Sequence, residues 1–145
     1  MAKTLCKELA KILKGEAEQK NDVCMVTRER KDLDVTILGH PTHSEMVISL
    51  EFSFEPISKR YEDFGFEPTS NRNETLNLAE LVFLQDEVNP FLEAIKKSDE
   101  IKVSAIHNHW LFEKPRLIYM HLESIQNPVE FAKEIARALK KAGVE

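Results

Sequence analysis

Glycine and proline are scarce in this sequence of 145 residues, with four and six copies, so long flexible linkers are not expected. A length near 150 residues is typical of one domain, and we interpret residues 1–145 as a single domain. Basic residues are outnumbered by acidic ones, which gives a formal net charge of −5. A protein that neutralises many phosphates needs a basic face, so nucleic acid is not expected as a partner.

Cysteine is also rare, and long hydrophobic runs are missing. Cys6 and Cys24 form no C-x-x-C or other paired motif, which predicts buried free thiols. No stretch approaches the roughly 18 consecutive apolar residues that cross a bilayer. Lysines interrupt residues 1–14, so the apolar core of a signal peptide is not present there. These observations predict a cytoplasmic protein without a membrane partner.

Apolar periodicity predicts runs of strands that are interrupted by a few helices. Asn127-Pro128-Val129-Glu130 has the pattern of a capping box, which predicts a helix that Gly143 ends. Residues 56–73 carry no such pattern and are expected to form a loop. The complete order is a helix over 4–19, strands over 23–28, 35–38, 45–54 and 76–84, a helix over 86–97, a hairpin of 101–109 with 117–123, and the C-terminal helix. This order predicts an α+β layer sandwich, with a mostly antiparallel sheet and helices packed on it.

Three of the five histidines lie in the predicted C-terminal hairpin. Residues two apart on a strand point to one face, so His107 and His109 should project together, with Val103 and Ala105 beneath them. His121 lies on the returning strand. It shares that face if it pairs with Ala105 or His107, and a shift of one residue turns it away.

Three imidazoles from two strands, with one coordination position open, are typical of catalytic zinc and non-haem iron sites. We therefore predict that His107, His109 and His121 bind a divalent metal, zinc or iron. Glu113, in the hairpin loop, is the candidate accessory ligand or the base acting on a metal-bound water. His40 and His43 are most simply interpreted as turn residues, although they could approach the hairpin in space.

Other functions remain open at this point. The histidines could each bond to a carboxylate or a carbonyl, or perform acid–base chemistry without a metal. A non-catalytic protein could bind a small polar or anionic ligand, with Arg116 and Trp110 completing its pocket. A structural protein could form a homo-oligomer through the turn at Trp110-Leu111-Phe112.

Several blocks of the sequence resemble a bacterial domain of unknown function typified by the LppY and LpqO lipoproteins. The resemblance is carried by Leu81–Pro90, which contains Asp-Glu-Val-Asn-Pro, by Val103–His109, which contains His-Asn-His, by Pro115-Arg116 with Met120-His121, by Arg30–Val35, and by the helix Phe131–Leu139. Ala79-Glu80 stands where the family usually has Gly-Asp, and the export signal of the lipoprotein members is missing, which suggests a cytoplasmic relative. The resemblance implies a single domain and the same histidines, and it implies no reaction.

Overall fold

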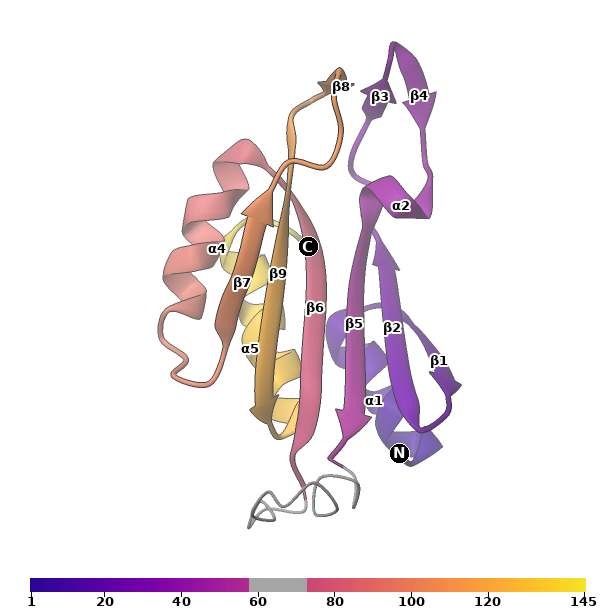
Figure 1. Ribbon diagram of the computed structural model, residues 1–145, viewed down its shortest axis with the longest axis vertical. Coiled ribbons are helices and arrows are strands. Elements are labelled where there is room, and N and C mark those ends of the chain that lie inside the picture. Colours follow the sequence, from indigo (N-terminus) through magenta and orange to yellow (C-terminus); the bar gives the residue numbers. More distant parts are fainter. Residues whose placement is uncertain (58–72) are drawn as a thin grey trace.

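The computed structural model describes residues 1–57 and 73–145, which form a six-stranded antiparallel sheet covered on one face by helices (Figure 1). The strand order in the sheet is β1-β2-β5-β6-β9-β7. The strands are β1 (Glu16–Lys20), β2 (Val23–Glu29), β5 (Ser49–Pro56), β6 (Thr75–Leu84), β7 (Lys102–His107) and β9 (Leu117–Gln126). The predicted α+β fold with a mostly antiparallel sheet is therefore confirmed.

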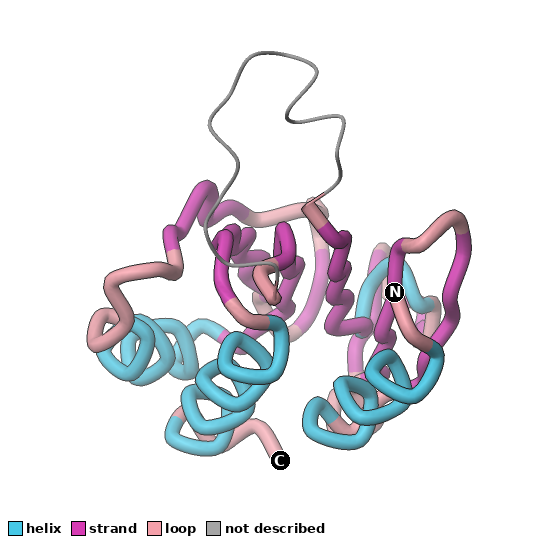
Figure 2. The backbone as a smooth tube through the Cα atoms, turned by 90° about the horizontal axis from the view of Figure 1, so that it is seen from below, coloured by secondary structure: helices cyan, strands magenta, loops and turns pink. Residues whose placement is uncertain are grey.

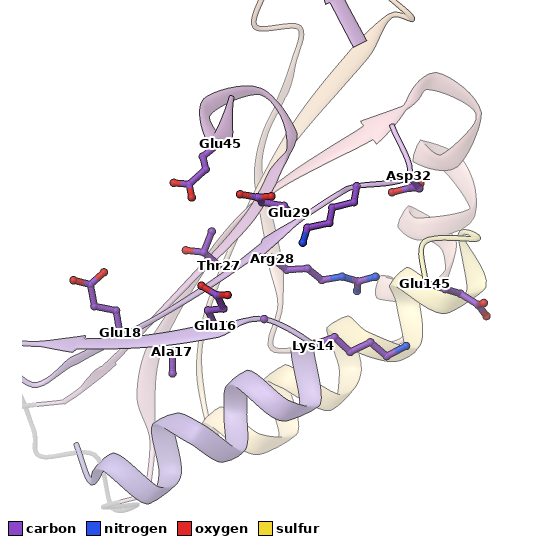
Figure 3. Close-up of a pocket in the computed structure, with 12 residues that line it drawn as sticks. Lys14, Glu16, Ala17, Glu18, Thr27, Arg28, Glu29, Asp32, Glu45 and Glu145 are labelled. Carbon is purple, nitrogen blue, oxygen red and sulfur yellow. The ribbon is translucent and has the colours of Figure 1, made fainter. Parts of the chain in front are cut away.

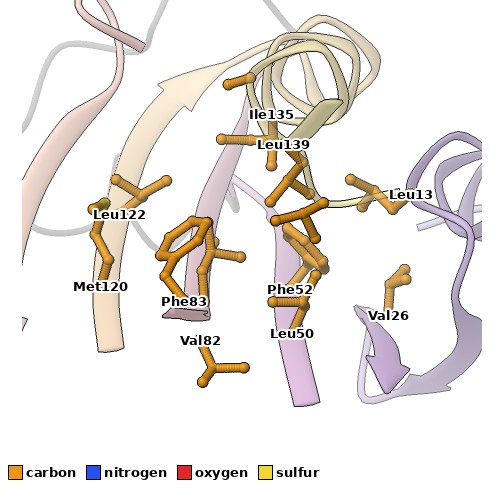
Figure 4. Close-up of a cluster of buried hydrophobic side chains, with 14 of the residues drawn as sticks. Leu13, Val26, Leu50, Phe52, Val82, Phe83, Met120, Leu122, Ile135 and Leu139 are labelled. Atoms are coloured by element: carbon orange, nitrogen blue, oxygen red, sulfur yellow. The ribbon is translucent and has the colours of Figure 1, made fainter. Parts of the chain in front are cut away.

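Three helices lie side by side on the same face of this sheet (Figure 2). They are α1 (Lys3–Leu13), α4 (Val88–Ile95), which follows the short 3-10 helix η1 (Gln85–Glu87), and α5 (Pro128–Lys141). The core between helices and sheet contains Phe52, Phe83 and Leu139 (Figure 4), each at most 1% exposed. In the described part of the chain, none of these three helices lies on the opposite face of the sheet, so we call it the open face.

The Asn127 half of the capping box predicted for the C-terminal helix is present. Asn127 Oδ1 accepts hydrogen bonds from the backbone N–H groups of Val129 at 2.9 Å and Glu130 at 3.2 Å. These bonds satisfy donors that the first helical turn leaves without partners, and Pro128 loses nothing at the first helical position. Gly143, with φ of 85°, follows the helix.

The first predicted helix is too long. It ends at Leu13, Lys14 adopts a left-handed conformation with φ of 59°, and residues 16–20 form the edge strand β1. Gly15 allows this turn because a Cβ there would lie 2.7 Å from the backbone oxygen of Thr27. Residues 16–20 have no apolar alternation, so only their pairing with β2 makes them a strand.

The predicted strand over 45–54 begins later than expected. Glu45–Ile48 form the short helix α2, and Met46, which fits the alternation in the sequence, is 71% exposed. A second sheet, of three strands in the order β4-β3-β8, lies beyond the end of the main sheet (Figure 1). Its strands are β3 (Val35–Ile37), β4 (His40–Thr42) and β8 (Glu113–Lys114). Most of the loop predicted over 56–73 lies outside the described residues.

The prediction of free thiols is wrong. Cys6 of α1 and Cys24 of β2 form a disulfide that fastens this helix to the sheet. The sequence could not predict it, because a separation of 18 positions between the two cysteines matches no motif and only the packing of α1 on β2 brings them together. The argument for a cytoplasmic location that used free thiols therefore fails. No helix in the described ranges is long and apolar enough to span a membrane.

Candidate functional site

The open face is organised in rows of side chains that run across the strands. One row consists of Glu51 on β5, Glu80 on β6, His121 on β9 and Ala105 on β7, each paired with the next in the antiparallel ladders. The next row contains Met25, Ser53, Leu78 and Glu123. Residues two apart along a strand share a face, so both rows lie on the face that the helices leave uncovered.

The pairing of Ala105 with His121 is one of the two registers that the sequence analysis required, and a β-bulge at Ser104 produces it. Val103 pairs with Leu122, so without the bulge Ser104 would oppose His121 and His107 would point to the helices. The extra residue therefore turns His107 onto the open face beside His121. Val103 was expected beneath the histidines, but its pairing with Leu122 places it on the other face.

The three imidazoles predicted from the sequence come together. The Nε2 atoms of His107 and His121 are 2.9 Å apart, and their rings are stacked with centroids at 5.1 Å. The ring of His109, just beyond the end of β7, lies 5.4 Å from that of His107. The side chains of His109 and His121 remain 38% and 35% exposed, so solvent reaches the cluster.

The tautomer of His107 is fixed by its neighbour. His107 Nδ1 lies 3.0 Å from the backbone oxygen of Asn108. A carbonyl oxygen can only accept, so Nδ1 carries the proton and donates it, and the lone pair of the neutral ring is at Nε2. Metal-binding histidines are typically oriented by this kind of bond from the other ring nitrogen.

Glu80 is the acidic member of the cluster, and the sequence analysis did not select it. Its Oε1 atom lies 3.9 Å from His109 Nε2 and 4.0 Å from His121 Nε2. A signal was present in the sequence, because Glu80 is a charged residue in the middle of a largely apolar strand. Its partner on the next strand, however, could not be known without the register.

Aromatic side chains support the histidines. Tyr119 pairs with His107 and lies beside the histidines on the same face, with its ring centroid 6.2 Å from that of His107 and 4.8 Å from that of His109. Its hydroxyl donates to the backbone oxygen of Val47 at 2.6 Å and accepts from Trp110 Nε1 at 2.8 Å. Burial, together with the charges of Glu80 and Glu113, raises the pKa of Tyr119 to about 12 despite the bond from Trp110. The phenol therefore stays neutral, and its two hydrogen bonds hold the ring against the histidines.

A small hollow adjoins the cluster on the open face. Its volume is about 230 Å³, and it is lined by Met25, Glu51, Phe52, Ser53, Leu78, Ala79, Glu80 and His121. Burial, with the charges of Glu80 and Glu45, raises the pKa of Glu51 above its usual range. The histidines therefore stand at the edge of a space that a small molecule can enter.

Other residues selected from the sequence lie elsewhere. Glu113 is in the small sheet, where its buried carboxylate forms an ion pair with Arg116, at 2.8 Å from Arg116 Nε. Arg116 is thus already paired with a carboxylate. His40 is exposed and pairs with Ile37 in the small sheet, and His43 follows that strand.

The turn Trp110-Leu111-Phe112, which was proposed for self-association, is only partly exposed to solvent. Trp110 is partly buried and packs against His109 with ring centroids 4.7 Å apart. Leu111 and Phe112 are 72% and 75% exposed. Trp110 therefore supports the histidine cluster, and only Leu111 and Phe112 could contact a second copy.

Two blocks noted in the sequence meet away from the histidines. Arg30, which is 2% exposed, donates to Glu87 Oε1 at 2.6 Å and Oε2 at 3.0 Å, and to Asp32 Oδ2 at 2.7 Å. Glu87 Oε1 also accepts from the backbone N–H of Leu84 at 2.6 Å. This buried network joins the end of β2 to η1 and has the character of a structural contact.

A larger groove, of about 760 Å³, lies along β1 and the end of β2 (Figure 3). Its lining carries charges of both signs. The basic residues are Lys14, Arg28 and Lys31, and the acidic residues are Glu16, Glu18, Glu29, Asp32, Glu45 and Glu145. None of the histidines lines it. Such a mixture selects no single ligand charge, so the histidine cluster is the stronger candidate site.

Among the described residues, no group of three or more His, Cys, Asp or Glu side chains is already arranged to hold a metal ion. Residues 7–63 and 61–141 match the model of a protein family described as Domain of Unknown Function (DUF1259). No curated protein and no solved structure matches the chain.

Proposed function

The chain belongs to the family described as Domain of Unknown Function (DUF1259), and we propose that it binds one divalent metal ion, zinc or iron, through His107, His109 and His121. Glu80 takes the accessory role that the sequence analysis gave to Glu113. Because the chain contains the His-Asn-His and Asp-Glu-Val-Asn-Pro blocks, we also propose that it is of the LppY/LpqO type.

The observation that carries the proposal is the spacing of the donor atoms of the three histidines and Glu80. The Nε2 atoms of His107 and His121 are 2.9 Å apart, and Glu80 Oε1 is 3.9 Å from His109 Nε2 and 4.0 Å from His121 Nε2. Ligand atoms about 2.0 Å from a tetrahedral zinc ion lie about 3.3 Å from one another. The observed separations of 2.9, 3.9 and 4.0 Å lie within about 0.7 Å of this value, a difference that side-chain rotations could remove.

The second layer of contacts fits the same role. The bond from His107 Nδ1 to Asn108 leaves Nε2 free for a metal, and Tyr119 and Trp110 pack against the rings. Two neutral imidazoles cannot both donate through Nε2, so without a metal His121 has to donate to His107. A metal ion beside the two Nε2 atoms would accept the lone pair of each of them.

The arrangement suits a metal-dependent enzyme-like protein, hydrolytic or oxygen-dependent. A metal bound there would supply Lewis-acid chemistry and could lower the pKa of a bound water. Glu80, which is 34% exposed in its side chain, could accept the proton of such a water or complete the ligand set. The hollow beside it offers space for a substrate.

The test is metal analysis of the protein purified without an affinity tag or chelator. We expect about one zinc or iron per chain, and a loss of most of it in His107→Ala and His121→Ala. Glu80→Gln should bind the metal about ten-fold more weakly or more. His43→Ala is the matched control, because it removes an exposed histidine of the other hairpin. Metal far below one equivalent, or a content that His107→Ala leaves unchanged, would contradict the proposal.

A further inference from the structure

We propose that the hollow beside His121 is a subsite for a small organic amine, whose ammonium group lies between Glu51 and Glu80. The inference rests on the proposed function, because the far end of such a ligand would face the metal-binding histidines. It adds a substrate class, a primary amine, to the metal site.

The rows of the open face set the dimensions of this subsite. Glu51 pairs with Glu80, and Glu80 pairs with His121, so the three residues stand side by side on adjacent strands. Neighbouring strands are about 4.8 Å apart, which separates the backbones of Glu51 and His121 by about 10 Å. The hollow itself has a volume of only about 230 Å³. The ligand is therefore small and extends across β6.

The lining determines the charge of the ligand. Glu51 and Glu80 are direct cross-strand neighbours, and like charges in this position are destabilising. No lysine or arginine is among the described residues that line the hollow. A bound ammonium group would relieve this repulsion, because both carboxylates attract it, whereas a carboxylate or phosphate ligand would increase the repulsion.

The remaining walls fit the carbon chain of an amine. Leu78, two residues from Glu80 on β6, provides apolar surface and is 40% exposed, whereas Met25 lies on β2 at the Glu51 end of the hollow. Ser53 adds one hydroxyl on the same row. Two carboxylates at one end, apolar walls and an imidazole at the other end describe a site that orients a molecule with one cationic terminus.

The experiment compares three probes of the same size, butylamine, butyrate and 1-butanol, by NMR titration of backbone amide shifts. Each titration is made with chelated protein and with zinc-loaded protein. We expect butylamine to bind in preference to the other two and to shift amides around Glu51 and Leu78. In Glu51→Gln the affinity for butylamine should fall at least ten-fold. Glu55→Gln is the matched control, because Glu55 is exposed on the same face of β5 and does not line the hollow.

The outcomes separate this inference from the metal proposal. Butylamine binding that depends on Glu51 supports the subsite, even if the protein holds no metal and the proposed function fails. Stoichiometric zinc binding without any effect of butylamine overturns the subsite and leaves the metal site intact. Preference for butyrate, equal binding to Glu51→Gln, or a second zinc ion that depends on Glu51 would each also overturn it.

Discussion

Glu87→Ala is expected to destabilise the protein more than any other single change to the Arg30 network. The substitution removes two hydrogen bonds from Arg30, at 2.6 and 3.0 Å, and one from the Leu84 backbone, at 2.6 Å. The side chain of Arg30 is 1% exposed, so its charge would lose its buried partner without gaining water. Breaking a buried ion pair in this way costs about 3–5 kcal/mol of unfolding free energy.

Two further variants show whether burial is the cause. Asp32 also pairs with Arg30, but its side chain is 57% exposed, so Asp32→Ala should cost less than about 1 kcal/mol. Replacing both buried partners, with Arg30→Met and Glu87→Gln, should recover much of the loss because no buried charge remains. The glutamine keeps an acceptor for the Leu84 N–H.

The assay is urea unfolding followed by circular dichroism, with the slope of the transition compared between variants. The reasoning would be refuted if Glu87→Ala cost less than about 1 kcal/mol, or if Asp32→Ala cost as much as Glu87→Ala. It would also be refuted if the double variant were less stable than Glu87→Ala alone.

Two more predictions concern Tyr119 and the disulfide. Tyr119→Phe leaves the Val47 oxygen and Trp110 Nε1 without their partner and should cost about 1–3 kcal/mol in urea unfolding. The folded-state pKa of Tyr119 is raised from 10.0 to about 12, so its contribution is complete below pH 10 and is lost as the pH rises towards 12. A fall in stability over this range that persists unchanged in Tyr119→Phe would contradict the assignment. Replacing Cys6 and Cys24 with alanine should cost about 3 kcal/mol, since the disulfide closes a loop with a sequence separation of 18. When the protein is unfolded without a reducing agent, a thiol assay should detect no reactive thiol. Two thiols per chain would show that Cys6 and Cys24 are not bonded.

The candidate site shows where sequence reasoning succeeds and where it stops. Alternation along one strand is a local property, so His107 and the neighbouring His109 could be selected from spacing alone. The choice of Glu113 as an accessory ligand or base stays a prediction, because it was made from nearness in sequence alone, which does not establish nearness in space across a hairpin loop. Glu113 instead forms an ion pair with Arg116 in the small sheet, and Glu80, 41 positions before His121 in the chain, lies beside the histidines.

The errors in the fold have the same physical origin. Met46 alternates with Ile48 and Leu50, yet residues 45–48 are helical, because a short apolar run does not distinguish a strand from a helical turn. Residues 16–20 are polar and form a strand only because β2 offers hydrogen-bonding partners. The strongest periodic segments, β6 and β9, and the capped helix α5 were predicted within a few residues.

The sequence by itself determined the elements whose cause is local, such as the cap at Asn127, the apolar face of α5 and the histidine pattern in the C-terminal hairpin. The tertiary structure decided what depends on partners distant along the chain. It brought Cys6 to Cys24, joined Arg30 to Glu87, and placed Glu80 and Glu51 beside the histidines. The bulge at Ser104 is the clearest case, since a single extra residue reverses the faces of the residues that follow it. Whether His107 meets His121 therefore depends on backbone pairing, which the order of residues along the two strands does not predict.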